Sequence, residues 1–83
     1  MSYEKVAQAT TGLIIGTKQS IKAMKAGKVT EVVIADDADP HITNKVSRLA
    51  AEFNIPCHHV DSMKRLGKAC GIDVGTATVS IKK

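Results

Sequence analysis

The chain has 83 residues, a net charge of +4 and a hydrophobic fraction of 43%, which predict one small folded domain over residues 1–83 and exclude a disordered chain. Its apolar runs are far shorter than the roughly 20 residues of a membrane-spanning helix, and its polar N-terminus does not resemble a secretory signal. We therefore expect a soluble cytoplasmic protein with no membrane partner, whose two cysteines are reduced thiols in or near the core.

Charge is distributed unevenly along the chain. Residues 1–28 carry five lysines and one glutamate, residues 29–61 carry two basic residues and six acids, and residues 62–83 carry five basic residues and one aspartate. If the fold brings the two basic ends together, they form a basic face suited to a polyanion, while the acidic middle disfavours binding elsewhere. Charge alone leaves open whether the basic excess serves only solubility.

The first half of the chain predicts a helix, a strand, a second helix and a second strand. Ser2 can cap the first helix, and the apolar residues 13–15 form the first strand. The second helix runs from Thr17 to about Ala26, where a glycine ends it. Residues 31–35 are almost continuously apolar, which is typical of a strand covered on both faces.

The second half begins with the clearest helix of the chain. Asp39 is its expected N-cap and Pro40 its first helical residue, where the missing N–H is not needed. One apolar stripe then follows at helical spacing: Ile42, Val46, Leu49, Ala50 and Phe53. Asn54 can end this helix in a left-handed conformation.

A strand, a helix and a last strand complete the alternation. Residues 57–60 form the third strand, and Ser62 caps the last helix. Residues 76–81 alternate between apolar and polar side chains, which predicts a half-exposed strand and makes this strand the candidate for an antiparallel position. Alternating helices and strands predict an α/β sandwich with helices on both faces of a central sheet.

The glycines around the first strand do not form a nucleotide-binding loop. A P-loop has four residues between its glycines and a lysine directly after the second one. Gly12 and Gly16 are one residue too close, and Lys18 does not directly follow a glycine. We therefore exclude nucleotide binding of this type.

Two groups of residues could in principle bind a metal. Asp36, Asp37 and Asp39 follow a strand, where carboxylates could hold Mg²⁺ or accept a phosphoryl group, but a capped helix start with a solvated acidic turn accounts for them without a ligand. In the Cys-His-His run at 57–59, the first and third side chains share a face and the second points away, which leaves too few ligands for a closed zinc site. We expect no enzyme activity and no cofactor, and a small metal-binding or phosphoacceptor module remains the alternative.

Basic residues gather on the second helix. Lys18, Lys22 and Lys25 are spaced as one cationic stripe, next to the exposed N-terminal amides of Gly16 and Thr17, which suit a phosphate. The aromatic fraction is only 2%, so the chain lacks stacking platforms for single-stranded RNA. An RNA ligand would have to be recognised by its shape, backbone and exposed base edges.

The last helix is also basic, and it leads into a glycine-bounded loop, Gly-Ile-Asp-Val-Gly, at 71–75. Apolar residues in such a loop either pack inward in a hairpin-like turn or contact a partner, and the sequence leaves both open. A pure protein-interaction domain is a third possibility for the chain, supported only by its lack of aromatic platforms.

Two stretches of the chain together resemble the L-seven-Ae-type ribosomal protein family of kink-turn RNA binders, and in size the chain is similar to the short bacterial members. The stretches read IIGTKQSIKAMKAGKVTEVVIADDADP and SMKRLGKACGIDVGTATVSI. Their shared motifs are G-T-x-x-x-x-K, an acidic A-x-D-x-D-P, and L-G-x-A-x-G followed by an apolar residue. The resemblance implies a three-layer α/β/α sandwich with a four-stranded mixed sheet whose last strand is antiparallel.

The same resemblance implies that the chain binds structured RNA bent at a bulge beside tandem sheared G·A pairs, in ribosomal or other RNA. In the helix that enters the opened major groove, Gly16 and Thr17 allow close backbone approach. Lys18 and Gln19 face guanine edges, and Lys22 reaches a phosphate or a base acceptor. We expect a monomer, because no exposed apolar helix face requires a protein partner.

The remaining contacts implied by the resemblance come from three other segments. Asp39 corresponds to an acidic position that can accept a hydrogen bond from a flipped-out base, and Lys64 and Arg65 correspond to backbone contacts. The loop that covers the bulged nucleotides consists of Ile72, Asp73 and Val74.

The sequence departs from the archaeal and eukaryotic pattern of this family. Lys18 and Gln19 stand where Asn-Glu is common, yet lysine can donate to guanine O6 and N7, and glutamine keeps an amide acceptor for a guanine amino group. Met63 stands where a lysine is expected after the serine that opens the last helix. The first departure removes a negative charge from the site, and the second alters part of the expected flipped-base pocket.

Overall fold

The computed structural model describes residues 6–7 and 12–83. Val6 and Ala7 are helical, and the rest of the first helix, predicted from Ser2, lies outside the described residues. The elements that follow are β1 (Leu13–Ile15), α2 (Thr17–Lys25), β2 (Val29–Ala35), α3 (Pro40–Glu52), β3 (Cys57–Val60), α4 (Met63–Ala69) and β4 (Thr78–Lys82). The other predicted helices and strands are thus confirmed, with shifts of one or two residues at some ends. None of the helices in the described part of the chain is long and apolar enough to cross a membrane.

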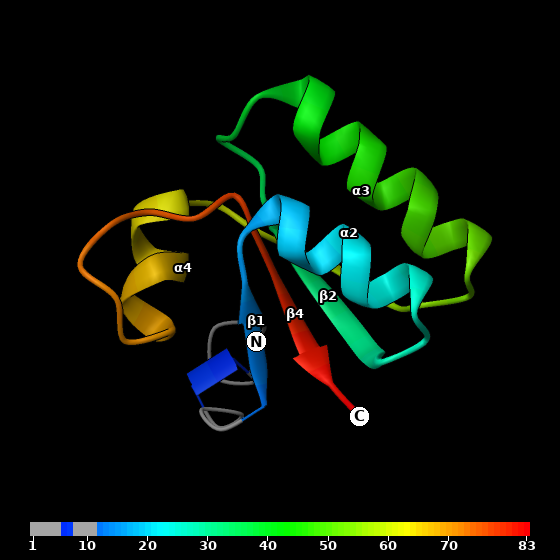
Figure 1. The fold of residues 1–83 in the computed structure, drawn as a ribbon. Coiled ribbons are helices and arrows are strands. Elements are labelled where there is room, and N and C mark those ends of the chain that lie inside the picture. Colours follow the sequence, from blue (N-terminus) through cyan, green and yellow to red (C-terminus); the bar gives the residue numbers. More distant parts are fainter. Residues whose placement is uncertain (1–5, 8–11) are drawn as a thin grey trace.

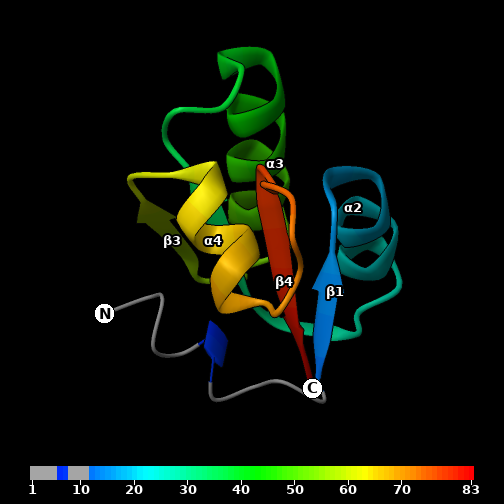
Figure 2. The same ribbon diagram turned by 90° about the vertical axis from the view of Figure 1, so that its left-hand side faces the viewer.

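The described strands form one sheet of four strands in the order β1-β4-β2-β3. β2 and β3 are parallel, and β4 is antiparallel to both of its neighbours. Helices α2 and α3 cover one face of the sheet and α4 covers the other (Figures 1 and 2). The predicted three-layer α/β/α sandwich, with a mixed sheet and an antiparallel last strand, is confirmed.

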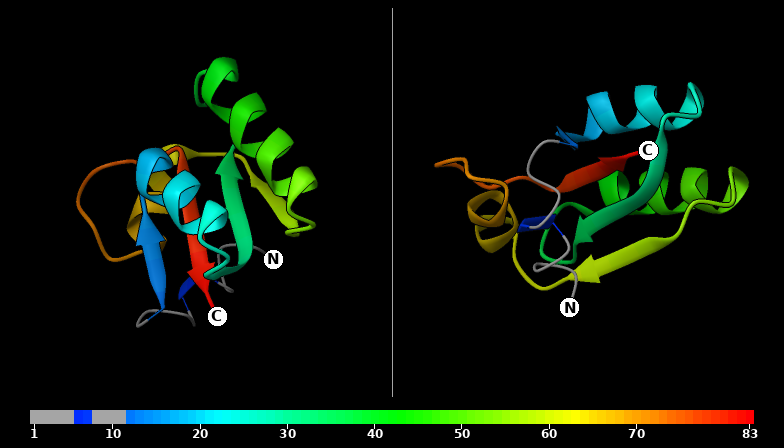
Figure 3. Two further views of the ribbon diagram at one scale, coloured as in Figure 1. Left: turned by 45° about the vertical axis from the view of Figure 1, so that its right-hand side comes forward. Right: turned by 90° about the horizontal axis from the view of Figure 1, so that it is seen from below.

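This topology brings four chain segments to one edge of the sheet. The carboxyl ends of β1, β2 and β3 and the amino end of β4 all lie there, at the upper edge in the left panel of Figure 3. The turn into α2, the loop before α3, the start of α4 and the loop before β4 are therefore neighbours. We call this edge the loop edge of the sheet.

Local capping rules account for most of the helix ends. The carboxylate of Asp39 accepts a hydrogen bond from the backbone N–H of His41 at 2.9 Å, and proline occupies the first turn of α3 as predicted. The hydroxyl of Ser62 accepts from the N–H of Arg65 at 3.2 Å and caps α4. Asn54 has a φ of 57° and ends the turn after α3 in the predicted left-handed conformation.

Two apolar clusters form the core, one on each face of the sheet. The cluster under α2 and α3 contains Met24, Val29, Val32, Ile34, Val46 and Ala50. The cluster on the α4 side contains Val6, Val33, Ala35, Val60, Leu66 and Val79. Alternate residues of β2 thus enter both clusters, which confirms that this strand is covered on both faces.

The last strand differs from its prediction, because it is buried on both faces. Thr78 and Ser80 are fully buried and lie opposite Ile34 and Val32 of β2, on the face that α2 covers. The prediction of a half-exposed strand was wrong because β4 lies inside the sheet and α2 packs on the face that carries these polar side chains, where Thr17 bonds Thr78.

The apolar stripe of α3 also ends earlier than predicted. Val46 and Ala50 are fully buried, but the side chain of Phe53 is 42% exposed. Phe53 is the C-cap residue, where the backbone leaves helical geometry and the periodicity of the stripe no longer applies.

Candidate functional site

The turn between β1 and α2 presents the first amides of a helix. Gly16 is the N-cap of α2, has a φ of 108° that glycine tolerates best, and provides no side-chain cap. Its N–H donates to the carbonyl of Thr78 at 2.9 Å, and the Thr17 hydroxyl donates to the Thr78 hydroxyl at 3.0 Å. The turn is therefore held firmly against β4 while its helix N-terminus remains suited to an anion.

The loop between α4 and β4 leads directly into Thr78, the residue that bonds this turn. The N–H of Ile72 donates to the carbonyl of Gly67 at 3.1 Å, and that of Thr76 donates to the carbonyl of Met63 at 3.1 Å. Ile72 is half-buried, whereas Val74 is 69% exposed. The alternatives left open by the sequence are thus divided between the two residues: Ile72 packs partly inward and Val74 faces outward.

A glycine in α4 permits this loop conformation. A Cβ at position 67 would overlap the backbone carbonyl of Val74 and would lie 3.1 Å from the Cα of Gly75. Only glycine therefore lets the loop backbone lie against the helix. Sequence reasoning missed Gly67 as a determinant of the loop, although it lies in the quoted L-G-x-A-x-G motif.

The three aspartates before α3 have separate partners. Asp36 lies 2.7 Å from the Nδ1 of His59, Asp37 accepts from the N–H of Met63 at 2.8 Å, and Asp39 caps its own helix. Nowhere in residues 6–7 and 12–83 do three His, Cys, Asp or Glu side chains come together as a possible metal site. The aspartates therefore serve the loop structure, and the metal or phosphoacceptor alternative gains no support.

The Cys-His-His run is divided between the two faces of the sheet, as predicted. The Nε2 of His58 lies 2.8 Å from a carboxylate oxygen of Glu31, whereas His59 pairs with Asp36 and Cys57 packs against the core under α3. Burial raises the pKa of the Cys57 thiol, and a nearby Asp36 adds to the rise while a hydrogen bond with Ser47 opposes it. Such a thiol is a poor nucleophile at neutral pH.

The cationic stripe predicted on α2 borders hollows on both flanks of the helix. Lys18, Lys22 and Lys25 are all exposed, as expected. However, Gln19 and Lys22 line a groove of about 300 Å³ on the flank toward β1, whereas Lys18 and Lys25 line hollows on the flank toward α3. The two residues predicted to face guanine edges, Lys18 and Gln19, thus diverge from the helix start.

The residues predicted on the other segments lie at or next to the loop edge. Lys64 and Arg65 are exposed on α4, where Arg65 lies 3.7 Å from Asp61. The start of α4 contacts the loop before β4, since a Cβ at Gly75 would lie 3.4 Å from the N of Lys64. Asp39 lies before α3 with its carboxylate engaged in the cap.

Comparisons with known proteins agree on one family. Residues 1–83 match the sequence model of the ribosomal protein L7Ae/L30e/S12e/Gadd45 family. The chain is 63% identical over 83 residues to an RNA-binding protein of Halalkalibacterium halodurans, with 100% of both chains covered. It is 58% identical over 81 residues to the RNA-binding protein YbxF of Geobacillus stearothermophilus, which covers 98% of each chain. Among solved structures, the 15.5 kD RNA binding protein of Giardia lamblia matches with a TM-score of 0.92 and 28% identity, covering 99% of this chain and 71% of that one.

Proposed function

The chain belongs to the ribosomal protein L7Ae/L30e/S12e/Gadd45 family, and we propose that it is an RNA-binding protein that recognises and stabilises kink-turns in ribosomal or other structured RNA. A kink-turn is a sharp bend at a bulge beside tandem sheared G·A pairs. The RNA-binding relatives and the RNA-binding structural neighbour support the choice of RNA as ligand.

One observation carries the proposal. The uncapped N-terminus of α2 and the loop with the exposed Val74 are joined through Thr78, which bonds both Gly16 and Thr17. The cationic helix start and the loop that presents Val74 thereby both adjoin the amino end of β4. Such a pair suits a bent RNA, which presents phosphates and base edges on one side of the bend and unstacked nucleotides on the other.

Each part of this interface has a chemical role in the proposal. The first amides of α2 and the ammonium of Lys22 bind phosphate, and Lys18 donates to the O6 or N7 of guanine. Gln19 offers its amide oxygen to a guanine amino group. The loop of Ile72, Asp73 and Val74 covers the bulged nucleotides, while Lys64 and Arg65 on α4 contact the backbone.

The protein acts by shifting a conformational equilibrium of the RNA. Because it contacts both sides of the bend at once, it binds the bent form better than the extended form and raises the population of the bent form. The proposal therefore includes no catalytic step, and it describes a monomer in the cytoplasm. The carboxylate of Asp39 caps α3 and also offers an acceptor to a flipped-out base.

A band-shift titration tests the proposal. A kink-turn RNA and a control RNA with its G·A pairs replaced by Watson–Crick pairs are titrated with the full chain in the same buffer and salt. We expect much tighter binding to the kink-turn RNA. Equal affinity for the two RNAs would reduce the activity to general basic attraction and would overturn the proposal.

A further inference from the structure

A surface groove runs between α2 and α3 and extends beyond the proposed kink-turn site. It consists of two adjoining hollows of about 590 and 440 Å³, which share His41 and Lys45 as lining residues. The first begins at Thr17 and Lys18, and the second reaches Lys25 and Glu52. We call the two hollows together the α2–α3 groove.

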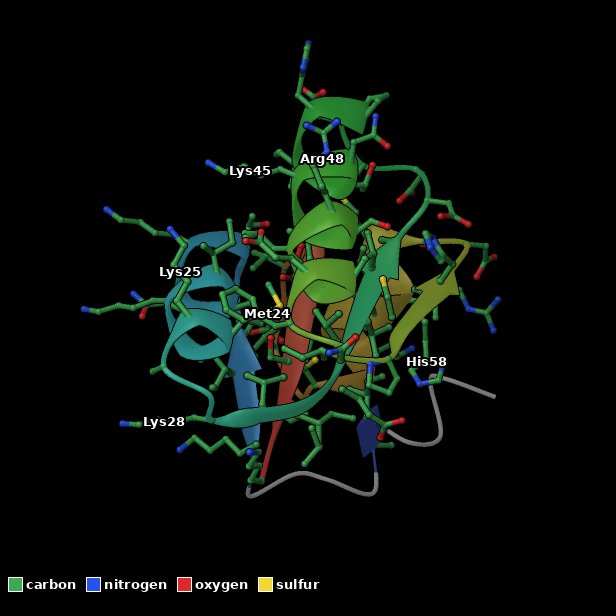
Figure 4. All side chains as sticks on the ribbon, turned by 90° about the vertical axis from the view of Figure 1, so that its right-hand side faces the viewer. Met24, Lys25, Lys28, Lys45, Arg48 and His58 are labelled. Atoms are coloured by element: carbon green, nitrogen blue, oxygen red, sulfur yellow. The ribbon has the colours of Figure 1, made fainter. Side chains whose placement is uncertain are left out.

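The charged side chains that line this groove are mainly cationic. Lys18 and Lys25 come from α2, and Lys45 and Arg48 come from α3. Among the described residues that line the groove, Glu52 is the one acid. All four cations are exposed, and none has a carboxylate oxygen within 4.0 Å among residues 6–7 and 12–83. Figure 4 shows Lys25, Lys45 and Arg48 on the same outer face of the molecule.

Most acidic residues of the middle segment are engaged away from the groove, whereas Glu52 lines it. Lys45 and Arg48 belong to the segment with six acids, 29–61. Four of these acids are engaged away from α2: Glu31 with His58, Asp36 with His59, Asp37 with the N–H of Met63, and Asp61 with Arg65. The segment that is acidic in sequence thus contributes two cations to a basic surface.

We propose that the α2–α3 groove binds the phosphate backbone of an RNA arm that continues past the bend. This inference rests on the proposed function and adds a second contact surface to it. Thr17 and Lys18 belong both to the groove and to the turn at the kink-turn site, so RNA bound at that turn is already at the mouth of the groove.

The dimensions and chemistry of the groove fit a short stretch of backbone. From Lys18 to Lys25 the helix rises about 10 Å. This length accommodates a short run of consecutive backbone phosphates. Arginine and lysine bind phosphate well, and no Phe, Tyr or Trp is among the described residues that line the groove, so we expect contact with the backbone rather than a stacking platform for bases.

Binding measurements with RNAs of different arm length test this inference. A minimal kink-turn RNA is compared with versions extended by one helical turn on one arm or on the other. The wild type should bind one of the extended RNAs more tightly than the minimal RNA. The Lys45→Gln/Arg48→Gln variant should lose this gain and bind the extended RNA roughly tenfold more weakly than the wild type does, as expected for two lost phosphate contacts. It should bind the minimal RNA as tightly as the wild type does.

The Lys82→Gln/Lys83→Gln variant is the matched control. It removes the same charge at the C-terminal end of β4, away from the loop edge, and neither residue lines the α2–α3 groove. If both double variants weaken binding to all RNAs equally, the effect is general charge and the inference fails. It also fails if the wild type gains nothing from either arm or if the groove variant retains the gain. A wild type that does not distinguish the kink-turn from its G·A-replaced control overturns the proposed function itself.

Discussion

The hydroxyl of Thr17 donates a hydrogen bond to the hydroxyl of Thr78 at 3.0 Å, and it joins residues 61 positions apart in the chain. Thr78 is fully buried in β4, whereas Thr17 is the first residue of α2. This bond therefore fixes the helix start to the central strand next to the loop that ends at β4. Together with the bond from the N–H of Gly16 to the carbonyl of Thr78, it sets the position of the helix start relative to the loop.

A double-mutant cycle measures this bond. Valine keeps the shape of threonine and removes the hydroxyl, so Thr17→Val, Thr78→Val and the double variant should reveal a coupling of about 0.5–1.5 kcal/mol in urea unfolding. Thr17→Val and Thr78→Val should also weaken binding to the kink-turn RNA. A coupling near zero would show that the bond does not contribute to stability.

Removing the hydroxyl of Ser80 should have the opposite effect on stability from removing that of Thr78. The Ser80 hydroxyl is fully buried and has no hydrogen-bond partner among the described residues. An unpaired buried hydroxyl costs about 1–3 kcal/mol, so Ser80→Ala should preserve or raise the free energy of unfolding. Thermal unfolding followed by circular dichroism provides the measurement, and a clear fall in Tm would indicate that the hydroxyl has a partner in solution.

Gly67→Ala should displace the covering loop. Alanine normally stabilises a helix relative to glycine by about 1 kcal/mol, so helix propensity alone predicts a gain. Because a Cβ at Gly67 would overlap the carbonyl of Val74, we instead expect lower stability and weaker RNA binding. Amide chemical shifts of residues 72–76 should change most, and unchanged shifts there would contradict the contact.

Gln19 and Lys22 should differ in how they affect RNA binding. Gln19→Ala should reduce the difference in binding free energy between the kink-turn RNA and its G·A-replaced control by about 1–3 kcal/mol, as expected for the loss of a base contact. Lys22→Ala should weaken both RNAs and reduce the salt slope by about one phosphate contact. Titrations at several salt concentrations separate the two effects. If Gln19→Ala leaves the difference in binding free energy between the two RNAs unchanged, Gln19 does not read a base. If Lys22→Ala leaves the salt dependence of binding unchanged, Lys22 does not contact a phosphate.

The two thiols should react slowly with alkylating reagents near neutral pH. Burial is the main cause that raises the pKa of Cys57 and Cys70 above the ordinary value of 9.0. The raised pKa values mean that the protonated thiols are favoured in the folded protein. Their contribution to the free energy of unfolding is therefore fully present below the ordinary pKa and is lost as the pH rises through the folded-state pKa values. The rate of alkylation by iodoacetamide should therefore rise at a higher pH in the folded protein than in the protein unfolded in urea. Equal pH profiles in the folded and the unfolded protein would contradict the raised pKa values.

The local features of the chain were predictable because they depend on neighbouring residues. Asp39 and Ser62 cap their helices as expected, and Asn54 takes the expected left-handed conformation, since each effect acts within a few residues. The motifs around Gly16 and the loop at 71–75 likewise indicated the family that the comparisons confirm. Their roles toward RNA stay predictions.

Other features needed the tertiary structure, because they depend on which element lies above which. The polar side of β4 is buried under α2, and Lys45 and Arg48 of an acidic segment join Lys18 and Lys25 across two helices. Sequence periodicity tells which side chains share a face of one element, but only the packing of the elements decides whether that face meets solvent or a neighbour. The sequence by itself therefore determined the order of the described helices and strands, several of their caps and the family, and the fold decided which charges and hydroxyls come together.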